Sequence, residues 1–213
     1  MKRKIDYSVY LVTDRGLSRG RTTLEILQGS VRGGVTCVQL REKNCPIREF
    51  IEQANSIKAH LNAHDIPLII NDRVDVAQAV GADGVHLGQS DMPLHVARKI
   101  LKDSMVIGVS AESLQDAIEA EKGGADYIGV SPIYATPTKT DTAPALGLEG
   151  LREIRNAVRI PLVGIGGLTK DNAADIIKHG ADGVAVVSAI VSADNPELAT
   201  KELLKTITRA RIS

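Results

Sequence analysis

Aromatic side chains are scarce in this chain, which has four tyrosines, one phenylalanine and no tryptophan among 213 residues. Proteins that bind single-stranded nucleic acid stack bases on aromatic side chains, so this composition argues against that class. Neither sign of charge is in excess, because 26 Lys and Arg residues balance 26 Asp and Glu residues. A chain without net charge has no general attraction for nucleic acid or for anionic membranes. We therefore expect small-molecule partners.

Cysteines and long apolar runs are also few. Cys37 and Cys45 stand outside any CxxC or histidine-rich pattern, which argues against a disulfide framework or a zinc site. No apolar run approaches the roughly 18 residues of a membrane span. The basic start, residues 1–4, is not followed by the apolar segment of a signal peptide. We expect a cytoplasmic protein with free thiols; its oligomeric state is not indicated.

Short β-branched segments alternate with longer segments of helical periodicity along the chain. Eight strands are expected over residues 7–13, 35–41, 67–71, 84–88, 105–110, 127–132, 161–165 and 183–188. Several are apolar on both faces, which is typical of a parallel sheet covered by helices. The clearest helix, over residues 47–61, carries its apolar side chains on one stripe. Eight strands alternating with eight helices predict an α/β fold, a single-domain (β/α)8 TIM barrel over residues 1–213.

An internal repeat supports this architecture. Gly-Ala-Asp triplets begin at Gly81, Gly124 and Gly180, each between a predicted helix and an even-numbered strand, and Gly33-Gly34 holds a similar place before the second strand. Glycine just after a helix supplies the left-handed conformation that ends it, so the repetition indicates (βα)2 units. The last interval is the longest, and its surplus falls in residues 133–146, after strand six. TIM barrels carry their active sites on loops of this kind.

Polar side chains end the second predicted strand. Period-two alternation turns Gln39 and Arg41 to one face of the strand, with Lys43 just beyond it. Buried polar groups need partners. Two interpretations remain open: an internal salt bridge to a neighbouring strand, or ligands at the mouth of the barrel.

Acidic residues follow strands three and four. Asn71 and Asp72 end the third strand and Asp91 follows the fourth, so neighbouring loops can bring the two carboxylates together. Mg2+ typically takes one or two carboxylates together with phosphate oxygens and water. Each aspartate alone could instead cap the helix that follows it. The nearby Arg41 and Lys43 favour metal or phosphate binding.

Two glycine- or hydroxyl-containing loops predict phosphate sites. Strand seven ends in Gly164-Ile165-Gly166-Gly167, before a helix expected from about Thr169, and strand eight ends in Val187-Ser188. Glycine-rich turns let phosphate reach backbone N–H groups at a helix N-terminus. The alternative is a tight turn in which Thr169 and Ser188 are helix caps. Residues 136–141 add threonines and Lys139 above the mouth.

The remaining polar candidates carry less weight. Ser110, at the end of strand five, is either a pocket hydroxyl or a helix cap. His86 lies within strand four, where a histidine is more often a hydrogen-bonded core residue than a catalyst. The other four histidines are expected on helices or helix ends at the surface. No Ser-His-Asp or Cys-His arrangement emerges.

Taken in order, these motifs resemble the thiamine phosphate synthase family over essentially the whole chain. They are Gln39-x-Arg41-x-Lys43, Asn71-Asp72, His86-Leu87-Gly88-Gln89-x-Asp91, Gly108-Val109-Ser110, Thr136-x-Thr138-Lys139, Gly164-Ile165-Gly166-Gly167 and Val187-Ser188. The resemblance implies an alkyl-group transferase that joins 4-amino-5-hydroxymethyl-2-methylpyrimidine diphosphate to 4-methyl-5-hydroxyethylthiazole phosphate. The products would be thiamine phosphate and pyrophosphate, with Mg2+ as cofactor.

The resemblance also implies a role for each residue. The pyrimidine diphosphate would be contacted by Gln39, Arg41, Lys43, Asn71, Ser110 and Lys139. The thiazole phosphate would be bound by Thr136, Thr138 and the backbone at Gly166, Gly167, Val187 and Ser188. Asp72 and Asp91 would hold Mg2+. The catalytic residues would be Arg41, Lys43, Lys139 and Ser110. The reaction would be dissociative, with negative charge building on the leaving diphosphate.

Three other functions remain as alternatives. A thiazole tautomerase is similar in fold and sequence but needs a positioned base for proton transfer. A non-catalytic barrel that binds thiamine precursors would not need a complete leaving-group site. Another phosphate-binding barrel enzyme would explain the glycine loops but not the two aspartates together with the Thr-x-Thr-Lys loop. We therefore favour the synthase.

Overall fold

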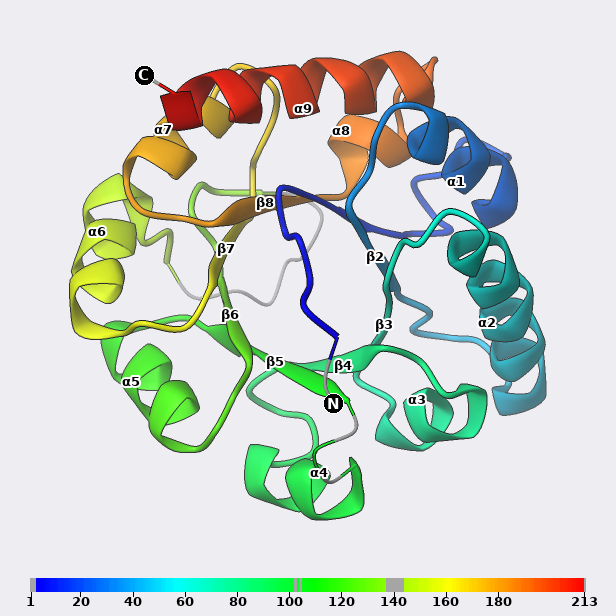
Figure 1. Cartoon of the computed structure of the whole chain (residues 1–213), viewed down its shortest axis with the longest axis horizontal. Coiled ribbons are helices and arrows are strands. Elements are labelled where there is room, and N and C mark those ends of the chain that lie inside the picture. Colours follow the sequence, from blue (N-terminus) through cyan, green and yellow to red (C-terminus); the bar gives the residue numbers. More distant parts are fainter. Residues whose placement is uncertain (1–2, 102, 104, 137–143, 213) are drawn as a thin grey trace.

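Eight parallel strands close into a barrel within the part of the chain that the computed structural model describes, residues 3–101, 103, 105–136 and 144–212 (Figure 1). The strands are β1 (Val9–Val12), β2 (Cys37–Leu40), β3 (Leu68–Asn71), β4 (Gly84–Leu87), β5 (Val106–Ala111), β6 (Tyr127–Val130), β7 (Leu162–Ile165) and β8 (Gly183–Val186). Each strand pairs with its sequence neighbours, and pairing of β1 with β8 closes the ring. The predicted TIM barrel is confirmed.

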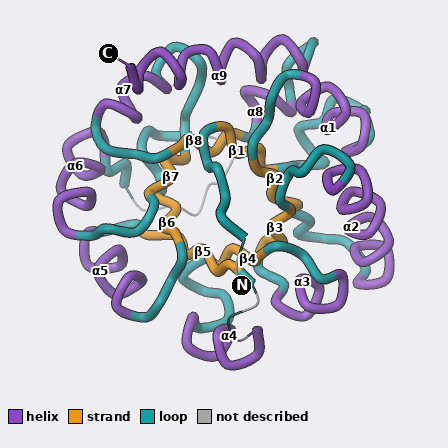
Figure 2. The backbone as a smooth tube through the Cα atoms, viewed as in Figure 1, coloured by secondary structure: helices purple, strands orange, loops and turns teal. Residues whose placement is uncertain are grey.

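Helices surround the strands as an outer ring (Figure 2). They are α1 (Thr23–Arg32), α2 (Ile47–Asn62), α3 (Val74–Val80), α4 (Leu94–Leu101), α5 (Leu114–Lys122), α6 (Gly147–Ala157), α7 (Ala173–Lys178), α8 (Ser188–Val191) and α9 (Pro196–Ile212). The helix predicted over residues 47–61 is present as α2. The expected pattern of one helix after each strand is wrong after β8, where the short α8 precedes α9. None of the helices in the described ranges is both long and apolar enough to cross a membrane.

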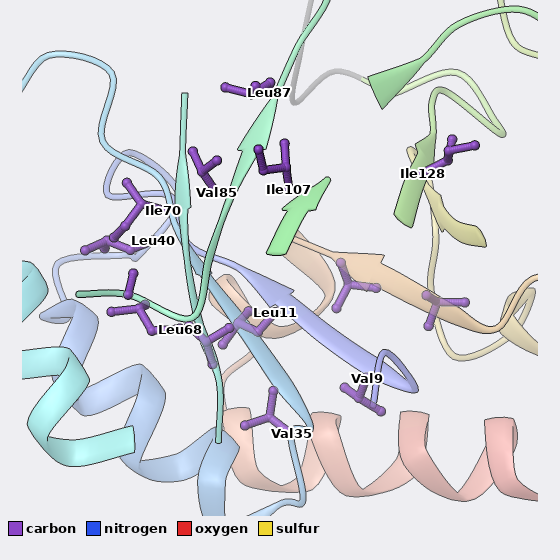
Figure 3. Packing of buried hydrophobic residues seen from close by; sticks show 14 of the residues in the cluster. Val9, Leu11, Val35, Leu40, Leu68, Ile70, Val85, Leu87, Ile107 and Ile128 are labelled. Atoms are coloured by element: carbon purple, nitrogen blue, oxygen red, sulfur yellow. The ribbon is translucent and has the colours of Figure 1, made fainter. Parts of the chain in front are cut away.

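Alternation along the strands builds two apolar cores. Outward-facing residues such as Leu11, Leu68 and Ile70 pack with the inner faces of the helices (Figure 3). A smaller cluster fills the inside of the barrel and consists of Tyr7, Tyr10, Val12, Cys37, Ile69, Val106, Tyr127, Val163 and Ala185. Both cysteines are free thiols, as expected. The interior cluster fills the inside of the barrel, so the space for a ligand lies beyond it, toward the carboxyl ends of the strands.

The glycine repeat ends helices as predicted and also starts strands. Gly34, Gly81, Gly124 and Gly180 all have positive φ angles. Two residues further on, Asp83, Asp126 and Asp182 each exchange two hydrogen bonds with the start of the preceding odd-numbered strand. Thr36 does the same with Val9 in the fourth unit. The repeat therefore fixes where neighbouring strands begin.

The amino end of the barrel is covered by the segment that leads into β1. This segment crosses the middle of the ring in Figure 1, and Arg3 donates to the carboxylate of Asp83 at 3.2 Å. The ring of Tyr7 lies 4.6 Å from that of Tyr127, centroid to centroid, inside the barrel. The opposite end, where the strands finish, is left to the loops that carry the candidate site residues.

One predicted helix start is wrong. A helix was expected from about Thr169, but α7 begins at Ala173. The side chain of Asn172 donates to the carbonyl of Gly167 at 3.0 Å and accepts from the N–H of Thr169 at 2.8 Å. These two bonds hold the intervening residues in a turn, so helical hydrogen bonding starts later.

Candidate active site

A cavity of about 550 Å3 opens at the carboxyl ends of the strands, and all eight strands or the loops that follow them contribute to its lining. The predicted site residues that line it are Gln39, Arg41, Lys43, Asn71, Asp72, Asp91, Ser110, Thr136, Gly166, Gly167, Val187 and Ser188. Thr138 and Lys139, which were also predicted, lie outside the described residues. The fold thus brings together residues that lie far apart in the sequence, from Gln39 in β2 to Ser188 after β8.

Arg41, just after β2, forms a salt bridge and also lies at the mouth of the barrel. Arg41 forms an ion pair with Asp14, 2.9 Å from Nη1 to Oδ2, so the salt bridge to a neighbouring strand end is present. The same side chain lines the cavity. The backbone N–H of Arg41 donates to Thr13 Oγ1 at 2.9 Å, which ties this loop to the end of β1. Asp14 therefore holds the guanidinium at the edge of the cavity.

Asp72 is positioned by an unusual backbone conformation. Its φ angle is 62°, in the left-handed region that few residues other than glycine, asparagine and aspartate adopt. Its N–H donates to the carbonyl of His86 at 2.8 Å, and its Oδ2 lies 2.6 Å from Lys43 Nζ. The alternative that Asp72 caps α3 is wrong, because Arg73 holds that position.

Asp91 is held by the turn that follows β4. Its Oδ2 accepts from the N–H of Gly88 at 2.7 Å, so this carboxylate bonds back toward β4. A Cβ on Gly88 would lie 2.9 Å from the same oxygen, so a larger residue there would shift the carboxylate. Burial raises the pKa of Asp91, and the neighbouring carboxyl of Asp72 raises it further. The two carboxyls are therefore close enough to interact.

The adjacent carboxyls of Asp72 and Asp91 are a fit for a hard divalent cation. Within the described ranges, no group of three or more His, Cys, Asp or Glu residues could hold a metal. Asp72 and Asp91 would therefore supply only two protein ligands. Mg2+ commonly keeps several waters and takes substrate phosphate oxygens, so a pair of carboxylates suits it.

The glycine-rich turn after β7 packs tightly against the loop after β6. A Cβ on Gly166 would lie 2.8 Å from Pro132 Cβ, and one on Gly167 would lie 2.8 Å from Tyr134 Cβ. The N–H of Tyr134 donates to the carbonyl of Gly166 at 3.1 Å. Both glycines are thus required for this close packing.

The helix-cap alternative fails for Ser188. In the described structure the residue before α8 is Val187, and no side chain caps that helix. Ser188 is the first residue of α8 and lines the cavity. Thr169 does accept a local bond, from the N–H of Asp171 at 3.3 Å, so the turn interpretation holds in part there.

The floor of the cavity contains residues that were not predicted as part of the site. Tyr10 and Tyr127 line it together with His86. His86 is hydrogen-bonded to the Tyr127 hydroxyl through Nδ1 at 2.9 Å and to Ser110 Oγ through Nε2 at 3.0 Å, as expected for a core histidine. Period-two alternation along strands one and six is the signal that could have identified both tyrosines as inward-facing.

Comparisons with known proteins identify one family by sequence and by structure. A family model described as thiamine monophosphate synthase matches residues 9–190. A thiamine-phosphate synthase from Albidiferax ferrireducens is 53% identical over 93% of this chain and 91% of the relative. Another thiamine-phosphate synthase, from Chloroflexus aurantiacus, is 50% identical over 93% of this chain and 92% of the relative. The solved structure of a thiamine phosphate pyrophosphorylase from Pyrococcus furiosus superimposes with a TM-score of 0.90, at 42% identity, over 96% of this chain and 97% of that chain.

Proposed function

This chain belongs to the thiamine monophosphate synthase family. We propose that the cavity at the carboxyl ends of its strands is the active site in which thiamine phosphate is formed. The enzyme is a transferase of thiamine biosynthesis. It condenses 4-amino-5-hydroxymethyl-2-methylpyrimidine diphosphate with 4-methyl-5-hydroxyethylthiazole phosphate, giving thiamine phosphate and pyrophosphate. The observation that supports this location is the convergence of twelve predicted site residues on one cavity.

The side of the cavity formed by the loops after β2, β3 and β4 suits the diphosphate. Arg41 and Lys43 provide positive charge, and Asp72 and Asp91 would hold Mg2+. Lys43 Nζ is already 2.6 Å from Asp72 Oδ2, so the ammonium stands beside the metal ligands. The ion, when bound, would offset charge on the diphosphate oxygens. Gln39 and Asn71, both buried, lie deeper and would contact the pyrimidine.

The opposite side, formed by the loops after β7 and β8, suits the single phosphate of the thiazole. Gly166 and Gly167 line the cavity and would offer it their backbone N–H groups, and Ser188 is the first residue of α8. Backbone N–H groups and a hydroxyl at a helix start bind phosphate oxygens well. Thr136 lines the same cavity from the loop after β6. Two separate anion sites within one cavity would hold the two substrates side by side.

The chemistry we propose is loss of the diphosphate before attack by the thiazole nitrogen. Negative charge then builds on the leaving group, where Arg41 and Lys43 would stabilise it as fixed cations. Ser110 would donate a hydrogen bond on the same side. The thiazole nitrogen carries its own lone pair, so no side chain needs to remove a proton. Binding the second phosphate would orient this nucleophile and lower the entropic barrier to the encounter.

The reaction is tested by incubating the protein with both substrates and Mg2+ and measuring thiamine phosphate by oxidation to fluorescent thiochrome. Product should form only when both substrates and the metal are present. Activity that persists in EDTA would contradict the metal part of the proposal. Absence of product from folded protein would contradict the assignment of the cavity as a synthase site.

A parallel assay separates the tautomerase alternative. Among the described residues that line the cavity, Glu112 is the one carboxylate outside the proposed metal pair. A tautomerase would isomerise a thiazole phosphate without the pyrimidine substrate, and replacing its base would abolish that conversion. We expect no such conversion, and we expect Glu112→Gln to retain synthesis of thiamine phosphate.

A further inference from the structure

Five side chains form one continuous hydrogen-bonded chain across the floor of the cavity. Gln39 Nε2 lies 2.9 Å from the hydroxyl of Tyr10, which lies 2.8 Å from that of Tyr127. The chain continues from Tyr127 to His86 Nδ1 at 2.9 Å and from His86 Nε2 to Ser110 Oγ at 3.0 Å. The five residues come from β2, β1, β6, β4 and β5. The two ends are residues that we assign to substrate binding.

The barrel interior is shaped around the middle of this chain. A Cβ on Gly108 would lie 2.0 Å from the ring of Tyr127, and one on Gly129 would lie 3.0 Å from His86 Cε1. Glycines at these two inward positions on β5 and β6 therefore leave the space that the two rings occupy. Tyr10 is 1% exposed and Tyr127 is fully buried, so neither ring can easily move away.

The direction of the hydrogen bonds follows from the donors that each group possesses. The Nε2 group of Gln39 can only donate, so the oxygen of Tyr10 accepts. Burial raises the pKa of both Tyr10 and Tyr127, which keeps both hydroxyls protonated. Tyr10 then donates to Tyr127, which donates to Nδ1 of His86. A neutral histidine that accepts at Nδ1 carries its proton on Nε2 and donates it to Ser110.

The reverse direction leaves a buried donor unsatisfied. If Tyr127 donated to Tyr10, the Tyr10 oxygen would accept twice, and its own hydrogen would have neither Gln39 nor Tyr127 as an acceptor. Buried hydroxyls without an acceptor are costly, so the first arrangement is favoured. In that arrangement the oxygen of the Gln39 amide and the hydrogen of the Ser110 hydroxyl are both left for the cavity.

We propose that Tyr10, Tyr127 and His86 are positioning residues that make Gln39 a hydrogen-bond acceptor and Ser110 a hydrogen-bond donor toward the ligand. The inference rests on the proposed function for its ligand. An acceptor at Gln39 matches the amino group of an aminopyrimidine, and a donor at Ser110 matches an anionic oxygen of its diphosphate. One hydrogen-bonded chain thereby sets the polarity of both contacts, although neither tyrosine needs to touch the reacting atoms.

Nitrogen-15 NMR of the histidine rings tests the direction of the chain without any substrate. At mildly alkaline pH the His86 ring, assigned by its loss in His86→Gln, should be neutral with its proton on Nε2. Tyr127→Phe should move the Nδ1 resonance toward that of a nitrogen that accepts no hydrogen bond. Tyr7→Phe is the matched control, because Tyr7 packs against Tyr127 without joining the chain, and it should leave the resonance unchanged. A proton on Nδ1 in the unsubstituted protein would overturn the proposal.

Kinetics test the positioning role at the Gln39 end. Tyr10→Phe should raise the KM for the pyrimidine diphosphate about fivefold, the scale of one hydrogen bond, and leave the KM for the thiazole phosphate unchanged. In a Gln39→Ala background the same substitution should have no further effect, because Tyr10 acts through Gln39. An equal effect in both backgrounds would show that Tyr10 acts directly or only through packing. A protein that makes no thiamine phosphate would refute the proposed function, while the NMR result would still decide the direction of the chain.

Discussion

At the scale of single residues, the backbone determines where the proposed metal ligands lie. The left-handed conformation of Asp72, with φ of 62°, turns its carboxylate toward the cavity and beside Lys43. Asparagine and aspartate tolerate this conformation better than alanine does. Comparing substitutions at this position therefore distinguishes the effect of losing the carboxylate charge from the effect of straining the backbone.

We predict that Asp72→Asn and Asp72→Ala both lower kcat/KM by about 100-fold, since each removes a group that would stabilise the leaving diphosphate through Mg2+. Asp72→Ala should in addition unfold more easily, by roughly 1 kcal/mol, because alanine is strained in the left-handed region. Steady-state kinetics over a Mg2+ titration and urea unfolding measure the two effects. Near-normal activity of Asp72→Asn would remove this residue from the metal site.

Ser188 gives a test of the second anion site. Its hydroxyl lines the cavity at the start of α8. We predict that Ser188→Ala raises the KM for the thiazole phosphate by about tenfold, the scale of a hydrogen bond to a charged oxygen. The KM for the pyrimidine diphosphate should not change, because that substrate would bind on the other side of the cavity. Initial rates with each substrate varied in turn decide this. A selective effect on the pyrimidine diphosphate would mean that the two sites are interchanged.

The sequence could predict the polar residues at the mouth of the barrel, but for the tyrosines on the cavity floor it could indicate only the direction in which they face. Arg41, Asp72 and Asp91 follow strands, where the fold class alone places ligands at one end of a barrel. Tyr10 and Tyr127 were missed because a tyrosine within an apolar strand has the same pattern whether it packs or binds. Their role depends on which strands lie across the barrel from one another, and that is a property of the closed ring.

At the scale of elements, the Gly-Ala-Asp repeat joins pairs of strands. Asp126 Oδ2 accepts from the N–H of Ile107 at 2.8 Å and from Arg98 at 2.6 Å. Asp182 Oδ2 accepts from the N–H of Leu162 at 2.8 Å and lies 3.3 Å from Arg155 Nη1. The side chain of Asp126 is 21% exposed, whereas that of Asp182 is 51% exposed. Water therefore reaches the carboxylate of Asp182 more easily than that of Asp126.

We predict that Asp126→Ala lowers the free energy of unfolding by about 2 kcal/mol, because the buried N–H of Ile107 loses its acceptor. Asp182→Ala should cost about 1 kcal/mol, since water can replace the carboxylate at the more exposed site. Urea unfolding followed by circular dichroism gives both values. Turnover under folding conditions should be unchanged in both variants, because these aspartates lie at the end of the barrel away from the cavity. Equal losses of stability would contradict the role assigned to exposure.

The positions of the elements were predicted better than their ends. Seven strands lie within the predicted segments and β5 extends one residue beyond its segment, because continuous apolar runs identify strands that are covered on both faces. Most observed strands are shorter than the predicted segments, at the amino end, the carboxyl end or both. The start of α7 was misplaced because the side chain of Asn172 holds a turn over residues 167–172. Such side-chain bonds to the backbone have no periodic signal in a sequence.

At the scale of the whole molecule, the contacts that close the barrel and the cavity that we propose as the binding site lie at opposite ends of the strands. The amino end is closed by the segment leading into β1 and by the strand-joining aspartates. The carboxyl end holds the cavity and the cations Arg41 and Lys43. Because the net charge of the chain is zero, attraction for an anionic substrate must come from this local group of charges. Binding should then stabilise the entire fold, since every strand contributes to the site.

We predict that pyrophosphate with Mg2+ raises the melting temperature by about 5–10 °C at a concentration near 100 times its Kd, which corresponds to roughly 2.7 kcal/mol for a domain of this size. The same pyrophosphate in EDTA should give a smaller rise, because Mg2+ would then no longer offset its charge. Asp72→Asn is the matched control, and it should lose the increment due to Mg2+ while keeping the increment due to pyrophosphate alone. Differential scanning fluorimetry with each combination measures these increments. An equal rise with Mg2+ and with EDTA would show that the anion binds through the cations alone, and the two carboxylates would then need another role.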